Sequence, residues 1–216
     1  MPVNKSLADI RKDYRLQSLL EKDADPDPIK QFETWWYQAL ESAIVEPNAM
    51  TLATSSSTGK PSARIVLLKG VSKNGFVFFT NYNSRKGKQI QENPFVCLVF
   101  LWKELERQVR IEGEVKKVSA NESDEYFSKR PLESRIGAWS SPQSKVIESR
   151  EILEKNVLDF SGKFQDKDIP RPQNWGGYIV SPTLIEFWQG RPGRLHDRLQ
   201  YTVSENNTWK IERLAP

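Results

Sequence analysis

The chain has 216 residues, which is enough for one large β-rich domain or two small ones. Its 32 basic and 28 acidic residues give a formal net charge of +4 and are scattered along the sequence, which favours local anion sites over a nucleic-acid-binding face. A single cysteine and a single histidine exclude an internal disulfide and a zinc site of the usual type.

The amino-terminal part of the chain is polar. The opening MPVNKSLADIRKDYR lacks the apolar stretch of a secretion signal, and no apolar run is long enough to span a bilayer, so we expect a cytoplasmic protein with no membrane partner. The turn-rich DADPDP, residues 23–28, lies at the end of this polar part. This composition predicts an arm, residues 1–27, ahead of one folded domain over residues 28–216.

A helix is predicted to begin at Pro28, with Asp27 as its N-cap. The helical spacing of the apolar residues indicates an amphipathic helix that packs on the core: Ile29, Phe32, Trp36, Leu40 and Ala43.

Strand patterns dominate the next part of the chain, over 49–54, 62–69, 75–81, 95–102 and 106–118. The short links between most of them indicate antiparallel pairing, and hence a barrel or a sandwich. Four apolar residues in a row within 62–69 predict a strand that is covered on both faces. In 106–118, alternation of apolar and polar residues predicts one buried face.

Helices and further strands are predicted in the carboxyl-terminal half. Ser119 and Glu122 form a capping box for a helix through Tyr126. Ser141 and Pro142 are predicted to start another helix, whose apolar residues recur at helical spacing: Val146, Leu153, Val157, Phe160 and Phe164. Strands return at 175–188, 199–203 and 208–215, so the fold class is mainly β (α+β) with flanking helices.

Common nucleotide and hydrolase motifs are absent: the sequence has no G-x-G-x-x-G, no G-x-x-x-x-G-K-[ST] and no G-x-S-x-G. Cationic and hydroxyl groups at the ends of elements remain. A helix start near Ser84, followed by Arg85 and Lys86, suits a phosphate, although a solvated turn is an alternative. Arg64 and Lys69 flank an apolar strand, and the alternative interpretation is that they are ordinary solvated charges at the rim of a barrel.

A third group follows the helix that Ser119 opens. Tyr126 and Arg130 lie one helical turn apart, and Ser134 follows the break at Pro131. Two hydroxyls and a guanidinium of this kind can bind the oxygens of a phosphate. An exposed helix face is the alternative interpretation.

The segment FWQGRPGRLHDR, residues 187–198, contains the only histidine of the chain. Arg194 and His196 alternate with Leu195, so they would project to one side of an extended backbone. The guanidiniums of Arg191, Arg194 and Arg198 would repel one another and lower the pKa of His196 unless they met anions. We therefore expect a negative group to bind here, the alternative being a polar loop with an idle histidine.

Taken together and in order, several motifs resemble those of the pyridoxamine 5′-phosphate oxidases (pyridoxine 5′-phosphate oxidases). They are RIVLLK, TNYNSRKGKQI, WKELERQVRIEG, YFSKRP, SRIGAWSSPQS, WGGY, IEFWQGRPGRLHDR and ERLAP. The resemblance extends from about the arm to the last residue. The arm matches only loosely, and the GRPGRL loop varies, but Arg194, His196 and Arg198 keep their places in the family pattern.

The resemblance implies a homodimer of FMN-binding split β-barrels with FMN at the subunit interface. It also implies a pyridoxal 5′-phosphate synthase that oxidises pyridoxine 5′-phosphate or pyridoxamine 5′-phosphate to pyridoxal 5′-phosphate in vitamin B6 salvage. Dioxygen would be the electron acceptor, and hydrogen peroxide would be released, with ammonia from the amine.

Site residues follow from the resemblance motif by motif. The FMN contacts of the family fall on Arg64, Ile65, Val66, Leu67, Leu68, Lys69, Phe79, Thr80, Arg85, Lys86, Gln108, Gln143, Ser144, Trp188 and Arg198. The substrate contacts fall on Arg11, Tyr14, Lys69, Tyr126, Arg130, Ser134, Arg194, Leu195 and His196.

Roles follow from the same resemblance. Arg194 and His196 would be catalytic, and the arm with Arg11 and Tyr14 resembles a segment that closes over the substrate. Two phosphates would need two separated cationic pockets, one formed by Arg64, Arg85 and Lys86 and the other by Lys69, Tyr126, Arg130 and Ser134.

Several alternatives stay open at this point. A flavin-binding split-barrel protein without oxidase activity would keep the FMN set but would not need the substrate set. A basic RNA-binding barrel would need exposed aromatic residues interleaved with cations, and the sequence has no such stripe. His196 is either a base for the C4′ proton or a clamp on the oxygen substituents of the substrate ring.

Overall fold

The computed structural model of the chain describes residues 13–165, 167–206 and 208–216, so the predicted contact Arg11 lies outside the described residues. The chain divides into two compact units. Unit 1 is formed by residues up to Pro47, by Val99–Ile111 and by Leu184–Pro216, and unit 2 by Asn48–Leu98 and Glu112–Thr183. Each unit therefore joins segments that are distant in sequence.

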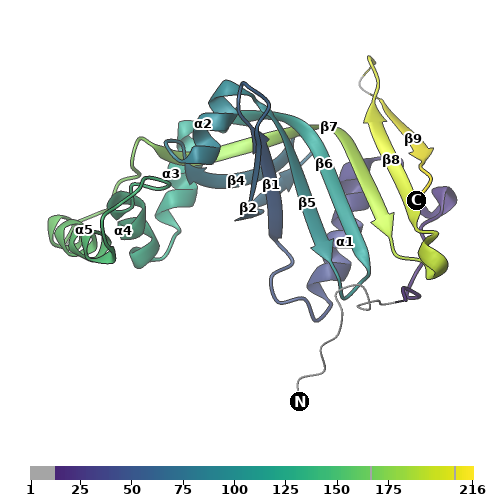
Figure 1. Ribbon diagram of the computed structural model, residues 1–216, viewed down its shortest axis with the longest axis horizontal. Helices are drawn as coiled ribbons and strands as arrows, with labels where there is room; N and C mark the ends of the chain where they lie inside the picture. Colours follow the sequence, from purple (N-terminus) through teal and green to yellow (C-terminus); the bar gives the residue numbers. More distant parts are fainter. Residues whose placement is uncertain (1–12, 166, 207) are drawn as a thin grey trace. The chain divides into compact units, whose positions relative to one another are not determined.

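The helices and strands follow one another in the order drawn in Figure 1. The helices are α1 (Pro28–Leu40), α2 (Arg85–Glu92), α3 (Ala120–Ser128), α4 (Leu132–Ser140) and α5 (Arg150–Lys163). The strands are β1 (Ala49–Ser55), β2 (Pro61–Leu67), β3 (Gly70–Ser72), β4 (Gly75–Asn81), β5 (Phe95–Trp102), β6 (Arg107–Lys117), β7 (Trp175–Gln189), β8 (Asp197–Val203) and β9 (Trp209–Arg213). Single 3-10 turns lie at Glu21–Asp23 and Pro192–Arg194.

The strands are hydrogen-bonded in the order β2-β1-β5-β6-β7-β4-β3, and β8 joins β7 to β9. The hairpins β1–β2, β3–β4 and β8–β9 are antiparallel, as are the pairs β4–β7 and β7–β8. The antiparallel pairing expected from the short links is thus confirmed, and each predicted strand is present within two residues of its expected ends.

Unit 1 is built around the inner face of α1. Phe32 is fully buried, and its ring lies 5.3 Å from that of Phe100. Trp35 packs edge-on against Phe187 at 5.2 Å. The prediction of a helix from Pro28 is confirmed, but its buried face contains Trp35 and Ala39 and not Trp36 and Leu40. The sequence could not tell which of the two neighbouring tryptophans is buried, because both are apolar and only packing distinguishes them.

The start of α1 supports a stability prediction. The carboxylate of Asp27 accepts a hydrogen bond from the N–H of Ile29 at 2.9 Å. Replacing Asp27 by alanine should lower the free energy of unfolding by about 1 kcal/mol, because this N–H would lose its cap. Urea unfolding at neutral pH measures the loss. Asp27→Asn keeps an acceptor oxygen and should lose much less, and an equal loss in both variants would contradict the capping role.

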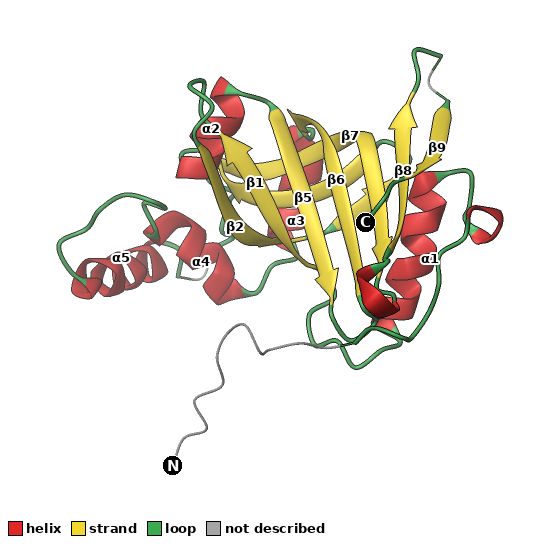
Figure 2. Cartoon of the chain, turned by 45° about the vertical axis from the view of Figure 1, so that its right-hand side comes forward, coloured by secondary structure: helices red, strands yellow, loops and turns green. Residues whose placement is uncertain are grey.

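Unit 2 contains the hairpin β1–β2, the strands β3 and β4, and helices α2 to α5. Figure 2 shows α4 and α5 side by side. A cluster of buried residues, Phe127, Ile136, Ile169 and Trp175, forms the core beneath these helices. Ser84 caps α2 by accepting the N–H of Gly87, as the predicted helix start near Ser84 requires.

Two predictions for unit 2 are corrected, and one helix of this unit was not predicted. Helix α5 begins at Arg150 and not at Ser141, because Ser144 has a φ of +69°, which no helix accommodates, and Val146 is fully exposed. Helix α4 was not predicted as a separate helix. Within the single chain, strand β2 is not covered on both faces, since it ends the strand order and Ile65 is 64% exposed.

In the described residues, no helix is both long enough and apolar enough to cross a membrane.

Candidate active site

A cavity of about 510 Å³ lies in unit 2 at the ends of β2 and β4 and beside α3 and α4. It brings together eleven of the residues that the sequence singles out: Ile65, Val66, Leu67, Lys69, Phe79, Thr80, Lys86, Tyr126, Arg130, Ser134 and Gln143. These residues come from segments up to 78 positions apart, from Ile65 to Gln143. The fold therefore assembles motifs that are individually weak.

The cavity is strongly cationic. Lys69, Lys86, Lys129 and Arg130 line it, and among the described residues that line it none is acidic. Cations brought together without a carboxylate repel one another, so an anion in the cavity relieves this repulsion. A phosphate monoester, which is dianionic near neutral pH, suits such a wall.

Arg130 has an unused hydrogen-bond donor. Its Nη1 atom is buried and has no hydrogen-bond partner among the described residues. The guanidinium lies 4.6 Å from the centre of the Trp175 ring, and burial lowers its pKa. A buried donor without a partner is costly, and an oxyanion in the cavity would remove that cost.

Three aromatic rings form the wall beside Arg130. The rings of Phe79 and Tyr126 are stacked with centroids 3.9 Å apart, and Phe79 is stacked on Trp175 at 5.5 Å. This packing fixes Tyr126 on α3, one helical turn before Arg130, as its sequence position predicts. The phenol and the guanidinium thus reach the cavity from a rigid support.

Lys86, in the first turn of α2, enters the same cavity. Its Nζ donates to Thr80 Oγ1 at 3.2 Å and to Gln143 Oε1 at 3.1 Å. Burial and the neighbouring charge of Arg64 lower its pKa. Both partners are neutral oxygens, so the positive charge of Lys86 is not neutralised by these contacts and stays available to an anion.

One residue of the first predicted cationic group lies beside the second group. Lys86 of the first group lines the same cavity as Lys69, Arg130 and the rest of the second. Arg64 does not line it, because its guanidinium is hydrogen-bonded to Leu52 O at 3.0 Å and to Thr54 Oγ1 and Ser62 Oγ at 2.6 Å. The other predicted residues of unit 2 outside the lining are Leu68, Arg85 and Ser144.

The remaining predicted residues belong to unit 1, where three rings meet. The imidazole of His196 lies 4.5 Å from Trp188 and 6.0 Å from Tyr14, and Tyr14 meets Trp188 edge-on at 5.8 Å. Gly190 permits this packing, since a Cβ at this position would lie 2.7 Å from the Tyr14 ring. The arm residue Tyr14 is thus brought to the predicted catalytic histidine. Gln108, Arg194, Leu195 and Arg198 are also in unit 1.

The backbone around His196 corrects one expectation. Arg194 and His196 do not alternate along an extended strand, because Pro192–Arg194 form a 3-10 turn in which Gly193 has a φ of 63° and Arg194 one of 64°. A positive φ at an arginine costs on the order of 1 kcal/mol and marks a strained turn. Leu195 is 74% exposed.

The arginines of this loop meet carboxylates of the chain itself. Arg191 lies 3.5 Å from Asp197, and Arg198 lies 2.8 Å from Glu186. The expected anions are therefore partly internal. The pKa of His196 is lowered, as expected, by burial and by the charge of Arg194. Imidazole is neutral at neutral pH in this setting.

Sequence reasoning missed four residues of the cavity wall, Asn81, Lys129, Pro131 and Trp175. Each is within a motif that was noticed: TNYN, YFSKRP and WGGY. The signal was present, but position within a motif does not tell which side chain faces the cavity.

Two family models match the chain. Residues 37–163 match the model described as "Pyridoxamine 5'-phosphate oxidase". Residues 175–216 match the model described as "Pyridoxine 5'-phosphate oxidase C-terminal dimerisation region".

Relatives named pyridoxine/pyridoxamine 5′-phosphate oxidase are similar along their whole length. The protein of Cyanothece sp. (strain PCC 7425 / ATCC 29141) is 60% identical over 211 residues, which cover 98% of this chain and 99% of the relative. The protein of Paraburkholderia phymatum is 58% identical over 211 residues, with the same coverage.

Solved structures agree with the split-barrel fold. The crystal structure of PhzG from Burkholderia lata 383 in complex with tetrahydrophenazine-1-carboxylic acid has a TM-score of 0.87 and 28% identity, and covers 93% of this chain and 99% of that one. A pyridoxamine 5′-phosphate oxidase-related, FMN-binding protein from Nostoc punctiforme PCC 73102 has a TM-score of 0.70 over 93% and 100% of the two chains, and at 18% identity supports the fold alone. The expected split β-barrel is confirmed, and the chain belongs to the pyridoxamine 5′-phosphate oxidase family.

Proposed function

We propose that the chain is an FMN-dependent oxidase that converts pyridoxamine 5′-phosphate or pyridoxine 5′-phosphate to pyridoxal 5′-phosphate. Dioxygen accepts the electrons, and hydrogen peroxide leaves, together with ammonia from the amine. The names of relatives at up to 60% identity support this substrate class. The observation that supports it most is the cavity with four cations and an unpartnered Arg130 Nη1, which suits a phosphate.

The residues present fit a flavin phosphate and a substrate phosphate. FMN would be held by the residues of 64–69 with Phe79, Thr80, Arg85, Lys86, Gln108, Gln143, Ser144, Trp188 and Arg198. When bound, it supplies a two-electron acceptor that dioxygen reoxidises. Lys69, Tyr126, Arg130 and Ser134 would bind the phosphate of the substrate, and Tyr14, Arg194, Leu195 and His196 would contact its ring. Fixing the substrate by its phosphate accounts for much of the rate through positioning.

The proposed enzyme is a homodimer with FMN at the subunit interface. The match to a dimerisation region supports association. Exposed apolar side chains of unit 2 support it as well, because Ile65 and Phe95 are 64% and 66% exposed on β2 and β5. Apolar strand residues of this kind are typically covered by a partner.

Oxygen uptake tests the proposal. The full chain, reconstituted with FMN, should be yellow and should consume dioxygen with pyridoxamine 5′-phosphate but not with unphosphorylated pyridoxamine, because the cationic cavity would stay empty of phosphate. Equal uptake with both amines would contradict the phosphate role of the cavity. Tight FMN binding without any uptake would instead support a flavin-binding protein without oxidase activity.

A further inference from the structure

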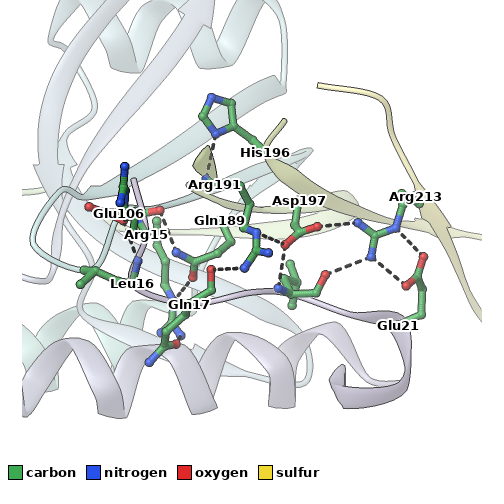
Figure 3. Close-up of polar contacts among 12 residues, drawn as sticks. Arg15, Leu16, Gln17, Glu21, Glu106, Gln189, Arg191, His196, Asp197 and Arg213 are labelled. Carbon is green, nitrogen blue, oxygen red and sulfur yellow. Dashed lines mark hydrogen bonds and ion pairs between the residues drawn. The ribbon is translucent and has the colours of Figure 1, made fainter. Parts of the chain in front are cut away.

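A backbone group of its own loop holds the imidazole of His196. The N–H of Arg191 donates a hydrogen bond to Nδ1 of His196 over 3.1 Å, as Figure 3 shows. A ring nitrogen that accepts a hydrogen bond carries no proton, so the proton of the neutral ring lies on Nε2. The bond therefore selects one of the two neutral tautomers.

The donor of this bond is itself held in place by Asp197. The Arg191 guanidinium lies 3.5 Å from Asp197 Oδ2, and its Nη1 donates to the carbonyl of Gln17 at 3.1 Å. The other carboxylate oxygen of Asp197 accepts from Arg213 Nη1 at 2.8 Å. Figure 3 shows Asp197 between these two arginines. The residue next to His196 thus anchors the residue that hydrogen-bonds its ring.

The arm closes the same network. Asp197 Oδ2 also accepts the N–H of Leu19 at 3.1 Å, and Arg213 donates to the carbonyl of Leu19 at 3.0 Å. Arg213 pairs in addition with Glu21 at 2.7 Å. Asp197 is consequently the one carboxylate in Figure 3 that joins the arm, β9 and the His196 loop.

The outer nitrogen of the ring has a different environment. Within the described part of the chain, no residue forms a hydrogen bond with Nε2 of His196, whose ring faces Trp188 at 4.5 Å. Burial and the charge of Arg194 lower the pKa of His196, so the neutral form dominates near pH 7. A neutral ring with Nε2 protonated can donate a hydrogen bond from Nε2 but cannot accept a proton there.

We propose that Arg191 and Asp197 are positioning residues that hold His196 as its Nε2–H tautomer, so that the ring donates a hydrogen bond to an oxygen of the substrate and is not the base. The inference deepens the proposed function, in which His196 contacts the substrate. For Nε2 to act as the base, the proton would have to lie on Nδ1, where it would face the N–H of Arg191. Two donors facing each other at 3.1 Å would destabilise that tautomer.

The single histidine makes the tautomer directly measurable. In the full chain with FMN, labelled with ¹⁵N-histidine, spectra at about pH 8 should show a protonated Nε2 and an unprotonated Nδ1, since the ring is then neutral. Asp197→Asn should move both shifts toward the averaged values of a free imidazole. Glu154→Gln, which removes the charge of an exposed carboxylate 3.0 Å from Arg150, should leave the spectrum unchanged. A proton on Nδ1 in the unmodified chain, or no effect of Asp197→Asn, would overturn the inference.

Two substitutions of His196 provide an independent readout. The amide nitrogen of glutamine reaches the position of Nε2 and can donate but cannot act as a base, whereas asparagine reaches only the position of Nδ1. His196→Gln should therefore retain a kcat about tenfold above that of His196→Asn, the value of one hydrogen bond. An equal loss in both variants would indicate a base and contradict the proposal. The spectra do not depend on turnover, so they decide the tautomer even if the chain does not oxidise B6 vitamers.

Discussion

Replacing Arg130 by methionine should raise the KM for pyridoxamine 5′-phosphate by about 10- to 100-fold while changing the free energy of unfolding little. Charge-assisted hydrogen bonds to a phosphate contribute about 1.5 to 3 kcal/mol, which gives this range. Methionine keeps an unbranched apolar side chain beside the Trp175 ring, over which the guanidinium of Arg130 lies at 4.6 Å. The stability should be preserved because burial already lowers the pKa of Arg130, which means that the folded chain disfavours its charge.

Steady-state kinetics and urea unfolding measure the two effects on the same Arg130 preparations. Arg130→Lys keeps the charge without the planar fork and should fall between the unmodified chain and Arg130→Met. Lys155→Gln removes a cation from an exposed position of α5 outside the cavity and should leave KM unchanged. A normal KM in Arg130→Met, or a loss of stability as large as its loss of binding, would contradict a ligand-binding role.

The sequence predicted which residues line the cavity better than it predicted how these residues are arranged. Motif resemblance selected Lys69, Tyr126, Arg130 and Ser134, and the structure places all four around one cavity. The resemblance could not show that the Arg64 guanidinium donates its hydrogen bonds to Leu52, Thr54 and Ser62. Those partners lie on β1 and at the start of β2, and their proximity depends on the hairpin register that pairs Leu52 with Arg64.

Regular elements were predictable where local chemistry decides them. Asp27, Ser84 and Ser119 each accept a backbone N–H at a helix start, and these caps are encoded within a few residues. Ser144 and Arg194 escaped prediction because neither residue type favours a positive φ, and only tertiary contacts impose one. The apolar residues after Ser144 continue a helical spacing, and this local pattern hid the true start of α5.

The ion-pair network around Glu186 could not be predicted from local sequence, because its charged residues come from three different strands of unit 1. Glu186 of β7 is 2% exposed and lies 2.6 Å from Arg110 Nη2 and 2.8 Å from Arg198 Nε. Burial alone would raise the pKa of Glu186, but the hydrogen bonds from Arg198 and Arg110 outweigh it and the pKa is lowered. The ion pair is thus formed by the folded chain, at positions where sequence shows only a strand with polar residues.

Replacing Glu186 by glutamine should lower the free energy of unfolding by about 2 kcal/mol at pH 7, because two guanidiniums would lose a buried counter-charge. The arginine side chains are 31% and 28% exposed, which places the loss below that of a fully buried pair. A carboxylate with a lowered pKa stabilises the fold above its unfolded pKa of about 4.3 and loses this contribution as the pH falls through its folded pKa. The difference in the free energy of unfolding between the unmodified chain and Glu186→Gln should therefore be largest at pH 7 and should decrease below about pH 4.

Urea unfolding of both chains across this pH range measures the difference. Glu125→Gln is the matched control, because Glu125 also pairs with a cation and has a lowered pKa, but its side chain is exposed. Solvent screens that pair, so its loss should change stability little at any pH. If the stability difference between the unmodified chain and Glu186→Gln stays constant down to pH 3, the packing of the side chain, and not its charge, stabilises unit 1. If the two chains instead become equally stable in acid, the charge of one buried carboxylate is what stabilises unit 1.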